Sequence, residues 1–468
     1  MAEEAFDVVF LGGGPAGYQG AIRAAQLGLR AAVVEARDLG GVCLNRGCIP
    51  TKTIKSSVDL LYRARRAGSY GLEIGSVKPE VKAIIERKDK VVGLLRGGIS
   101  QLFRANGITL YEGCGRFLSR EAIEVEGVKG SVRIRAKKAV IATGSRPLIP
   151  GFFAGGQPGV LTTDEILNIS SVPQSLLIIG GGAVGVEMAS IMAELGSSVT
   201  LLEMQERILP REDGEMADYL TRMLKRQKIK VMTGVSVSEV RPGERVSLFL
   251  SNGQTLEGDA VLVAIGRLPN LEGIGLEEAG LDHRAGPLPV NERMETAVTG
   301  IFAAGDVTGG WLLAHVAFAE GIVAAENAAG LDRRMDYRVV PRCIFSLPEY
   351  AAVGMSEEEA KECCPATVAV FPLKSLGMAQ AMGEWEGMAK LVVHKDTGEI
   401  LGGHIIGPHA SDLIAEIALA MRHGIPAKGI METIHAHPTL SEAVLEVAQA
   451  ACGQAIHILP AKGNEKRP

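Results

Sequence analysis

The distribution of apolar and polar residues predicts one arrangement of elements that occurs twice in the chain. The segment FDVVFLGGGPAGYQGAIRAAQLGLRAAVVEAR starts at Phe6, and SLLIIGGGAVGVEMASIMAELGSSVTLLEMQ starts at Ser175. Each begins with a short apolar run, passes through a glycine-rich turn into a stretch with helical spacing, and ends in a second apolar run that reaches an acid. Short buried strands flanking a helix are typical of a βαβ unit in a parallel sheet. The pattern therefore predicts two βαβ units.

The two segments align without a gap, and their glycines and acids recur. The matched residues, offset by 168 positions, are Gly12, Gly14, Gly17, Gly28 and Glu35 in the first copy and Gly180, Gly182, Gly185, Gly196 and Glu203 in the second. In such a turn the first glycine permits a tight bend, the second lets the backbone approach a diphosphate, and the third allows helix and strand to pack closely. The diphosphate lies at the positive helix end and the acid binds ribose hydroxyls. One copy alone predicts little, because glycine turns also have structural uses, but two copies predict two dinucleotide sites.

The residues after the second acid bear on the choice of cofactor. Glu203 is followed by Met204 and Gln205, where an arginine for the 2′-phosphate of NADP could stand. A carboxylate at Glu203 repels that phosphate, so the sequence favours NAD(H) over NADP(H). Arg207 keeps NADP(H) open as the alternative.

Two further glycine-bearing segments follow short apolar strands. KKAVIATGSRPLIP contains Thr143 and Gly144, and TAVTGIFAAGDV ends at Asp306. Asp306 is either an ordinary turn acid or a contact to the ribityl or phosphate part of a flavin, and the spacing does not decide between them. We expect Thr143, Gly144 and Gly266 to belong to the cofactor sites.

The segment GGVCLNRGCIPTKTIKSS directly follows the first βαβ unit and carries Cys43 and Cys48. Their position beside a cofactor site favours a redox-active pair. A static disulfide and half of a zinc site are the structural alternatives. The first is unusual in a reducing cytoplasm, and the second lacks a matching Cys or His pair. If the residues after Gly47 form a helix, its N-terminus and Lys52 lower the thiol pKa and favour the thiolate.

The other cysteines lie outside this motif. Cys114, Cys343 and Cys452 stand alone in apolar surroundings, where a small buried side chain is the expected role. The adjacent Cys363 and Cys364 are open to either a structural or a chemical interpretation.

The C-terminal segment ETIHAHPTLSEAVLEVAQA supplies the candidates for an acid/base group. Pro438 disfavours helix at His437, so this imidazole is expected in an extended turn ahead of a helix that begins near Thr439. Glu442 either completes a capping box with Thr439 or holds the ring nitrogen of His437 that faces away from a substrate, and both interpretations stay open. His435 is expected to have a packing or surface role.

Length, composition and charge narrow the class of protein. With 468 residues, 58 glycines and 47% hydrophobic residues, the chain is expected to form a globular protein of about three domains. A net charge of −5 without long runs of one sign argues against nucleic acid or an anionic membrane as partner. No apolar stretch reaches the length of a membrane span, and MAEEAF leads directly into a strand, so a cytoplasmic location is expected. No metal site is expected.

The motifs together resemble a known family. In chain order, GGVCLNRGCIPTK, the two G-x-G-x-x-G turns, ATG, GIFAAGD and HAHPTLSE are similar to those of the class I flavoprotein disulfide reductases, over residues 6–457. Within that family the chain is most similar to the branch that oxidises dihydrolipoamide. The resemblance implies an α/β fold with two Rossmann-like dinucleotide-binding domains and a C-terminal α/β dimerisation domain. The implied regions are 1–148 for FAD, 149–270 for NAD, 271–337 completing the FAD site and 338–468 forming the dimer interface.

The resemblance also implies roles for single residues. Cys43 exchanges with the substrate disulfide, and Cys48 forms the thiolate against the flavin. His437 is the base, oriented by Glu442, and it acts on the cysteines of the other subunit, so a homodimer is required. Further contacts near the cofactor are implied for Lys52 paired with Glu187, for Asp306, and for the turn Ala314-His315-Val316.

The implied activity is NAD-dependent oxidation of dihydrolipoamide on a lipoylated carrier domain of a 2-oxo acid dehydrogenase or glycine cleavage complex. An NAD(P)H-dependent reductase of another low-molecular-weight disulfide is the alternative, and a non-catalytic flavoprotein with structural cysteines is a third reading. Thr51 in place of serine is a mild departure from the family, and the apolar stretch AHVAFAEG leaves flavin potential and NADH inhibition open. The phosphate-binding arginines of a glutathione reductase and the terminal cysteine pair of a mercuric reductase are missing from the sequence.

Overall fold

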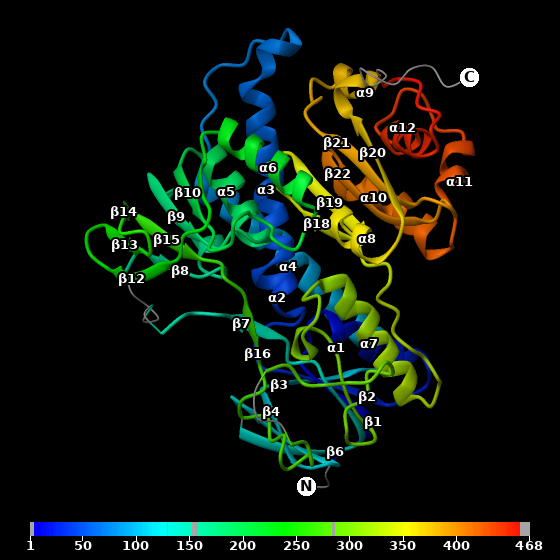
Figure 1. Ribbon diagram of the computed structural model, residues 1–468. Helices are drawn as coiled ribbons and strands as arrows, with labels where there is room; N and C mark the ends of the chain where they lie inside the picture. The colour runs from blue at the N-terminus through cyan, green and yellow to red at the C-terminus, as the bar shows by residue number, and fades with distance from the viewer. Residues whose placement is uncertain (1–3, 129, 152, 154–157, 283–285, 459–468) are drawn as a thin grey trace. The chain divides into compact units, whose positions relative to one another are not determined.

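The computed structural model describes residues 4–128, 130–151, 153, 158–282 and 286–458 (Figure 1). Helices and strands alternate along the described chain, which confirms the predicted α/β class. The chain divides into two compact units, each built from separate stretches of sequence. The first unit consists of Met1–Pro150, Leu161–Ser171 and Ile265–Asp336, and the second of Gly151–Val160, Val172–Ala264 and Tyr337–Pro468. Each unit contains one of the two repeated segments.

A seven-stranded sheet forms the centre of the first unit. Its strands are ordered β3, β2, β1, β6, β5 and β4, with β17 paired to β6. Their bounds are β1 Glu4–Leu11, β2 Ala31–Glu35, β3 Thr109–Glu112, β4 Cys114–Ser119, β5 Ala122–Gly127, β6 Gly130–Ile141 and β17 Ile301–Ala303. β1 is parallel to both β2 and β6, and β17 is parallel to β6, so the carboxyl ends of these four strands share one edge. The first predicted βαβ unit is confirmed as β1, α1 (Pro15–Gln26) and β2.

Helix α1 packs closely against α7 (Ala314–Ala328), because both present glycine or alanine at the contact (Figure 1). A Cβ atom at Gly20 would lie 2.7 Å from the Gly321 oxygen, and one at Gly321 would lie 2.1 Å from the Ala16 oxygen. The remaining elements of the unit are α2 Gly41–Arg46, α3 Cys48–Arg65, α4 Val81–Ala105, the short helices η1 Ala67–Tyr70, η2 Ile166–Asn168 and η3 Asp306–Thr308, and the paired strands β7 Ser145–Pro147 and β16 Arg267–Pro269.

The second repeat forms the corresponding part of the second unit. β9 (Ser175–Ile179) and β10 (Ser198–Leu202) are parallel and are joined by α5 (Ala183–Leu195), which confirms the second predicted βαβ unit. The sheet is ordered β11, β10, β9, β15 and β8, and a separate antiparallel sheet follows the order β12, β13, β14. The other bounds are β8 Val160–Leu161, β11 Lys230–Met232, β12 Val237–Arg241, β13 Val246–Leu250, β14 Thr255–Gly258, β15 Ala260–Val263 and α6 Gly214–Arg226.

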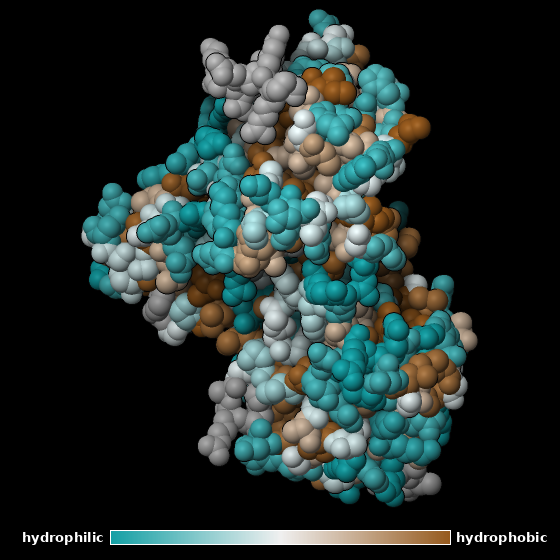
Figure 2. All heavy atoms as spheres, turned by 45° about the vertical axis from the view of Figure 1, so that its right-hand side comes forward, coloured by the Kyte–Doolittle hydropathy of each residue, from teal (hydrophilic) through white to brown (hydrophobic). Residues whose placement is uncertain are grey.

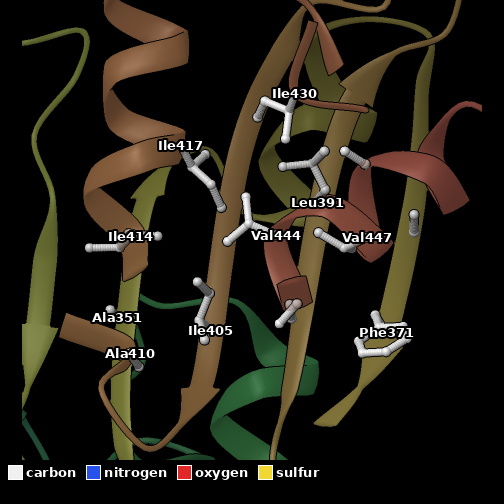
Figure 3. Packing of buried hydrophobic residues seen from close by; sticks show 14 of the residues in the cluster. Ala351, Phe371, Leu391, Ile405, Ala410, Ile414, Ile417, Ile430, Val444 and Val447 are labelled. Carbon is white, nitrogen blue, oxygen red and sulfur yellow. The ribbon is translucent and has the colours of Figure 1, made fainter. Parts of the chain in front are cut away.

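The C-terminal part of the second unit is a five-stranded antiparallel sheet covered by helices. The order is β18 (Arg342–Ile344), β19 (Glu349–Gly354), β22 (Ile400–Gly407), β21 (Met388–His394) and β20 (Ala366–Pro372). Helix α10 (Ala410–Arg422) covers β19 and β22, and α12 (Glu442–Ala451) covers β20 and β21. Figure 3 shows the resulting core, in which Ile417 of α10 and Val444 of α12 lie over Ile405 and Leu391 of the sheet. The smaller helices are α8 Glu357–Cys363, η4 Leu373–Ser375, α9 Gly377–Ala381 and α11 Ala427–Glu432.

A buried ionic cluster fixes the starts of α6 and α8 within the second unit. Lys390 on β21 is 1% exposed, and its ammonium lies 2.9 Å from Asp213, 3.0 Å from Glu215 and 2.6 Å from Glu357. Asp213 also accepts hydrogen bonds from the N–H groups of Met216 and Glu357. One carboxylate therefore joins two helix starts to the sheet.

The molecular surface is mixed in character. Figure 2 shows hydrophilic residues interspersed with apolar ones across the visible face. Of the helices among the described residues, none combines the length and the apolar character of a membrane span. Cys343 and Cys452 are half-buried against the C-terminal core, but Cys114 is exposed, so the prediction of a buried side chain is wrong there. The reason is its place at the start of β4, an edge strand with one face in solvent.

Candidate active site

The first glycine turn lies at the carboxyl edge of the first unit's sheet. Gly12 follows β1 with φ +106°, and a Cβ atom there would lie 2.2 Å from the Ala142 oxygen. A Cβ atom at Gly17 would lie 1.8 Å from the Gly12 oxygen. In the second unit, Gly180 has the same φ, and a Cβ atom at Gly185 would lie 1.9 Å from the Gly180 oxygen. Both copies therefore require glycine at the first and third positions.

The acid that ends each repeat holds the glycine turn from the neighbouring strand. Each carboxylate accepts two backbone hydrogen bonds of the same kind. Glu35 accepts the N–H of Gly13 at 2.7 Å and that of Arg37 at 2.8 Å. Glu203 accepts the N–H of Gly181 at 2.7 Å and that of Gln205 at 2.8 Å. An ionised carboxylate has about four acceptor positions. Each acid therefore retains acceptor capacity for ribose hydroxyls.

Both turns fit the diphosphate of a dinucleotide. Helices α1 and α5 begin directly after Gly14 and Gly182, and no N-cap side chain bonds their first amides. Uncapped N–H groups at a helix start attract anions. In the described part of the chain, a Cβ atom at Gly182 would meet nothing within 4 Å, and one at Gly14 would meet Gly41 Cα at 3.7 Å. The middle glycine of each turn thus faces space that the protein itself does not fill.

Thr143, Gly144 and Asp306 lie at the same sheet edge, because they follow the parallel neighbours β6 and β17. Thr143 Oγ1 donates a hydrogen bond to the Asn270 carbonyl oxygen at 2.6 Å, and Gly144 accepts the Asn270 N–H at 2.9 Å. Asp306 accepts a hydrogen bond from Ser145 Oγ at 2.5 Å. These bonds give Asp306 a structural partner, and its contact to a flavin stays a prediction.

The cysteine segment is tied to the first glycine turn. A Cβ atom at Gly41 would lie 2.6 Å from Gly14 Cα, so α2 begins in contact with the turn. Cys43 lies in α2, and Cys48 is the first residue of α3. A helix does follow Gly47, so the condition stated for the effect of its N-terminus is met.

The two cysteines are partly buried thiols with a side-chain hydrogen bond between them. This hydrogen bond, burial and the charge of Cys48 raise the pKa of Cys43, while the positive charge of Lys52 opposes the rise. The predicted lowering of the thiol pKa is therefore wrong for Cys43. When two thiols lie this close, ionisation of one disfavours ionisation of the other. The closeness of the two thiols therefore favours a single thiolate on the pair.

His437 is presented at the surface of the second unit. Its side chain is 77% exposed, and it lies in an irregular turn, as predicted. Helix α12 begins at Glu442, three residues later than the predicted start near Thr439. The reason is local, since Thr439 Oγ1 donates to the Ala436 carbonyl oxygen and contacts Ser441 Oγ, which keeps residues 439–441 in a turn.

Glu442 contacts His437 and also accepts the backbone N–H of Thr439, but the predicted capping box is incomplete, because the Thr439 hydroxyl bonds to Ala436 and Ser441 and α12 begins only at Glu442. One carboxylate oxygen lies 2.8 Å from His437 Nδ1, and the other accepts the N–H of Thr439 at 2.9 Å. Burial raises the pKa of Glu442, but the hydrogen bonds from Thr439 and His437 outweigh it and leave that pKa below its ordinary value. Because a carboxylate only accepts, Nδ1 of His437 carries the proton. Nε2 is then the nitrogen that can take a proton from another group.

The neighbouring His435 has the expected packing role. Its side chain is 5% exposed, with Nε2 2.8 Å from a Glu416 carboxylate oxygen and Nδ1 2.9 Å from the Thr433 carbonyl oxygen. Both ring nitrogens are thus engaged within the second unit.

Three other predicted positions are placed as follows. Glu187 lies on α5 in the second unit and accepts the N–H of Phe345 at 2.9 Å, whereas Lys52 lies on α3 in the first unit, so their pairing stays a prediction. Ala314 is the first residue of α7. Gly266 precedes β16 with φ +136°.

Two buried or half-buried polar residues of this edge were missed. Arg267 donates from Nε to Ser145 Oγ at 2.7 Å and lies 3.9 Å from Asp306. Glu320 is buried on α7 and accepts the N–H of Gly305 at 2.7 Å. The sequence contained a signal for the second, because an acid inside the otherwise apolar stretch AHVAFAEG needs a partner when it is buried.

The chain is similar to known proteins over nearly its full length. Residues 6–321 match the family described as pyridine nucleotide-disulphide oxidoreductase, and residues 340–448 match the dimerisation domain of the same family. The dihydrolipoyl dehydrogenases of Chlamydia muridarum and Bacillus subtilis are 43% and 42% identical to it, over 98% of this chain and 99% and 100% of the relatives. The crystal structure of LpdA from Mycobacterium tuberculosis is similar with a TM-score of 0.89 and 29% identity, covering 95% of this chain and 99% of that one.

Proposed function

Because the chain belongs to the pyridine nucleotide-disulphide oxidoreductase family, we propose that it oxidises protein-bound dihydrolipoamide to lipoamide and reduces NAD. The observation that carries the proposal is the Cys43–Cys48 pair held against the first glycine turn. The relatives named dihydrolipoyl dehydrogenase support the choice of substrate. The cofactors are FAD and NAD.

The two glycine turns are the proposed cofactor sites. Gly12, Gly14, Gly17 and Glu35 would hold FAD in the first unit, together with the edge formed by residues 142–144 and 305–306. The second turn would hold NAD, with Glu203 on the ribose hydroxyls. FAD bound there would supply the two-electron redox chemistry that links the dithiol to NAD. We also propose four functional regions: residues 1–148 bind FAD, 149–270 bind NAD, 271–337 complete the FAD site and 338–468 form the dimer interface.

Cys43 and Cys48 would carry the exchange chemistry. In the oxidised enzyme they form a disulfide, and a substrate thiolate attacks Cys43 Sγ, so that the S–S bond breaks and the electron pair stays on Cys48. The second substrate sulfur, once deprotonated, displaces Cys43 from the mixed disulfide. Lipoamide then leaves, and both cysteines are reduced. The raised pKa of Cys43 suits this sequence, because the leaving Cys43 recovers a proton and Cys48 keeps the negative charge.

His437 would move the protons of this exchange. Nε2 accepts the proton of the first substrate thiol, while Glu442 holds Nδ1 and stabilises the positive charge that forms on the ring. The proton of the second substrate thiol passes to the departing Cys43 thiolate. The match to a dimerisation domain at residues 340–448 supports action in a homodimer, with His437 facing the cysteines of the partner subunit. The proposed partner is the lipoylated carrier domain of a 2-oxo acid dehydrogenase or glycine cleavage complex, in a reducing cytoplasm.

The Cys43→Ser variant tests the proposal. Lipoamide turnover should fall by at least about 10³-fold while FAD stays bound, because the attacked sulfur is lost but the glycine turn is intact. The matched control is Cys114→Ser, which removes an exposed thiol at the start of β4 and should leave turnover unchanged. Full activity of Cys43→Ser contradicts the mechanism. Faster turnover of glutathione disulfide than of lipoamide, with NADH or NADPH, would instead favour a reductase of another disulfide.

A further inference from the structure

Three sulfur atoms lie together at the two ends of α8, and the proposed reaction uses none of them. Cys363 Sγ is 3.3 Å from Cys364 Sγ and 3.8 Å from Met355 Sδ. The carbonyl oxygen of Ala360 lies 3.4 Å from the first thiol and 3.6 Å from the second. All four residues belong to the second unit. Met355, Cys363 and Cys364 are called the sulfur cluster below.

The local fold brings these sulfurs together. Ser356 caps α8 in a capping box with Glu359, so the helix begins immediately after Met355 and ends at Cys363. The backbone of Met355 is fixed on both sides, since its N–H donates to the Leu401 carbonyl oxygen and its own carbonyl oxygen accepts from His404 Nε2. The Met355 side chain nevertheless reaches the thiol of Cys363 at the far end of α8.

The sulfur cluster is accessible from solvent. Cys363 is exposed, Cys364 is half-buried, and Met355 is 39% exposed. The surrounding helix is acidic, with four glutamates and one lysine in EEEAKEC. Its C-terminal end, where both thiols lie, carries the partial negative charge of the helix dipole. A small cation is thus attracted to the place where the sulfurs meet.

We propose that the sulfur cluster binds one Cu(I) ion through the thiolates of Cys363 and Cys364 and the thioether of Met355. Thiolate and thioether sulfur together form the ligand class that selects Cu(I) among common biological metals. Binding releases the two thiol protons and leaves a three-sulfur complex of charge −1, with no change in the oxidation state of copper or sulfur.

The distances fit this coordination. With metal–sulfur bonds of about 2.3 Å, three sulfurs in a plane around one ion lie about 4 Å apart. The two observed separations are 3.3 Å between the thiols and 3.8 Å from Cys363 Sγ to Met355 Sδ, both somewhat shorter than that value. Zn²⁺ fits less well, because a structural zinc site has four ligands.

A competition titration tests the proposal. The FAD-loaded Cys43→Ser/Cys48→Ser protein is the background, because it removes the other cysteine pair as a copper ligand. Cu(I) is added without oxygen in competition with a chromophoric Cu(I) chelator. One ion per chain should bind, and adding Cys363→Ser or Cys364→Ser should weaken binding at least 100-fold. Adding Met355→Leu should weaken it about tenfold, as expected for loss of the weaker ligand.

Matched substitutions separate this site from other sulfurs. Cys114→Ser removes an exposed thiol, and Met204→Leu removes an exposed thioether that is 67% accessible, so neither should change the affinity. X-ray absorption at the copper edge should show three sulfur neighbours in the background protein. The proposal is overturned if the Cys363→Ser/Cys364→Ser protein binds Cu(I) as tightly as the background. It is also overturned if Met355→Leu leaves both affinity and sulfur count unchanged, or if the cysteines form a disulfide under these conditions and take up no copper.

Discussion

One oxygen of Glu442 holds Nδ1 of His437, and the other holds the N–H of Thr439. The two bonds make the start of the turn and the orientation of the ring depend on the same side chain. Glu442 thus both stabilises the turn and orients the ring of the proposed base. The exposed imidazole is therefore held in one tautomer without being buried.

Glu442→Gln should separate these two functions. The amide oxygen can still accept from one partner, but the negative charge that stabilises a protonated His437 is lost. We expect kcat for lipoamide turnover to fall roughly 10²-fold, the lower end of the range for acid/base groups. Reduction of a dye that takes electrons from the flavin directly is the control, and it should be unchanged. Normal lipoamide turnover in Glu442→Gln would show that the carboxylate only caps the turn.

At the scale of elements, the second glycine turn contains two positions where only glycine fits and one position where a larger side chain meets no protein atom among the described residues. Gly185 is needed because a Cβ atom there would lie 1.9 Å from a backbone oxygen, and Gly180 is needed because its φ is +106°. Gly182 stands between them and meets no such obstacle in the described part of the chain. A methyl group added at Gly185 is therefore expected to disturb the fold, whereas one added at Gly182 is not.

Gly182→Ala and Gly185→Ala form a matched pair. Gly182→Ala should change the free energy of unfolding by about 0.5 kcal/mol or less, because the added methyl group contacts no protein atom. Its KM for NAD should nevertheless rise at least about tenfold, since the methyl group stands where a diphosphate approaches. Gly185→Ala should lower the melting temperature as well. Thermal melts with steady-state NAD titrations measure both effects, and equal behaviour of the two variants would contradict the assignment.

The buried cluster around Asp213 makes the second unit sensitive to acid. Burial raises the pKa of Asp213, but the N–H of Glu357, the charges of His404 and Lys390, and the hydrogen bond from Lys390 leave that pKa lowered. A lowered carboxyl pKa stabilises the folded state above the unfolded pKa of about 3.9, and the contribution disappears as pH falls through the lower folded value.

Asp213→Ala should therefore destabilise the protein at pH 7 by roughly 3–5 kcal/mol, because Lys390 stays buried without its 2.9 Å partner. The difference from the parent protein should shrink when urea unfolding is repeated at pH values falling from about 3.9 through the lower folded pKa of Asp213, where the folded carboxylate becomes protonated. The exposed ion pair Arg241–Glu239 provides the control, and Glu239→Ala should cost less than about 1 kcal/mol. A pH-independent difference for Asp213→Ala would contradict this account.

At the scale of the whole molecule, the proposal places the active site between two subunits. Cys43 and Cys48 lie in the first unit, and His437 and Glu442 lie in the second. If the site forms between subunits, a dimer of Cys43→Ser with His437→Gln contains one site with both defects and one with none. If the site forms within one subunit, both of its sites are defective.

Mixed dimers distinguish these arrangements. Random reassociation of equal amounts gives half mixed dimers with one intact site in two, so activity should return to about a quarter of the parent value. Each variant alone, taken through the same dissociation and reassociation, should stay inactive and serves as the control. Absence of recovery, with mixed dimers demonstrated by mass, would place the whole site in one chain.

The sequence by itself determined the features that depend on neighbours along the chain. Both βαβ units, the tight turns at Gly12 and Gly180 and the irregular turn at His437 follow from local steric rules and were predicted. Glycine permits tight turns, and proline disfavours helix at the residue before it, whatever the surrounding structure is. Both effects can therefore be predicted from the sequence.

Only the tertiary structure decided the features that depend on residues distant in sequence. The raised pKa of Cys43 arises from its approach to Cys48 and from burial, although a helix start and Lys52 suggested the opposite. The joint role of Glu442 and the exposure of Cys114 on an edge strand likewise depend on three-dimensional neighbours. Electrostatic and packing energies depend on distance and solvent access, and sequence spacing alone specifies neither.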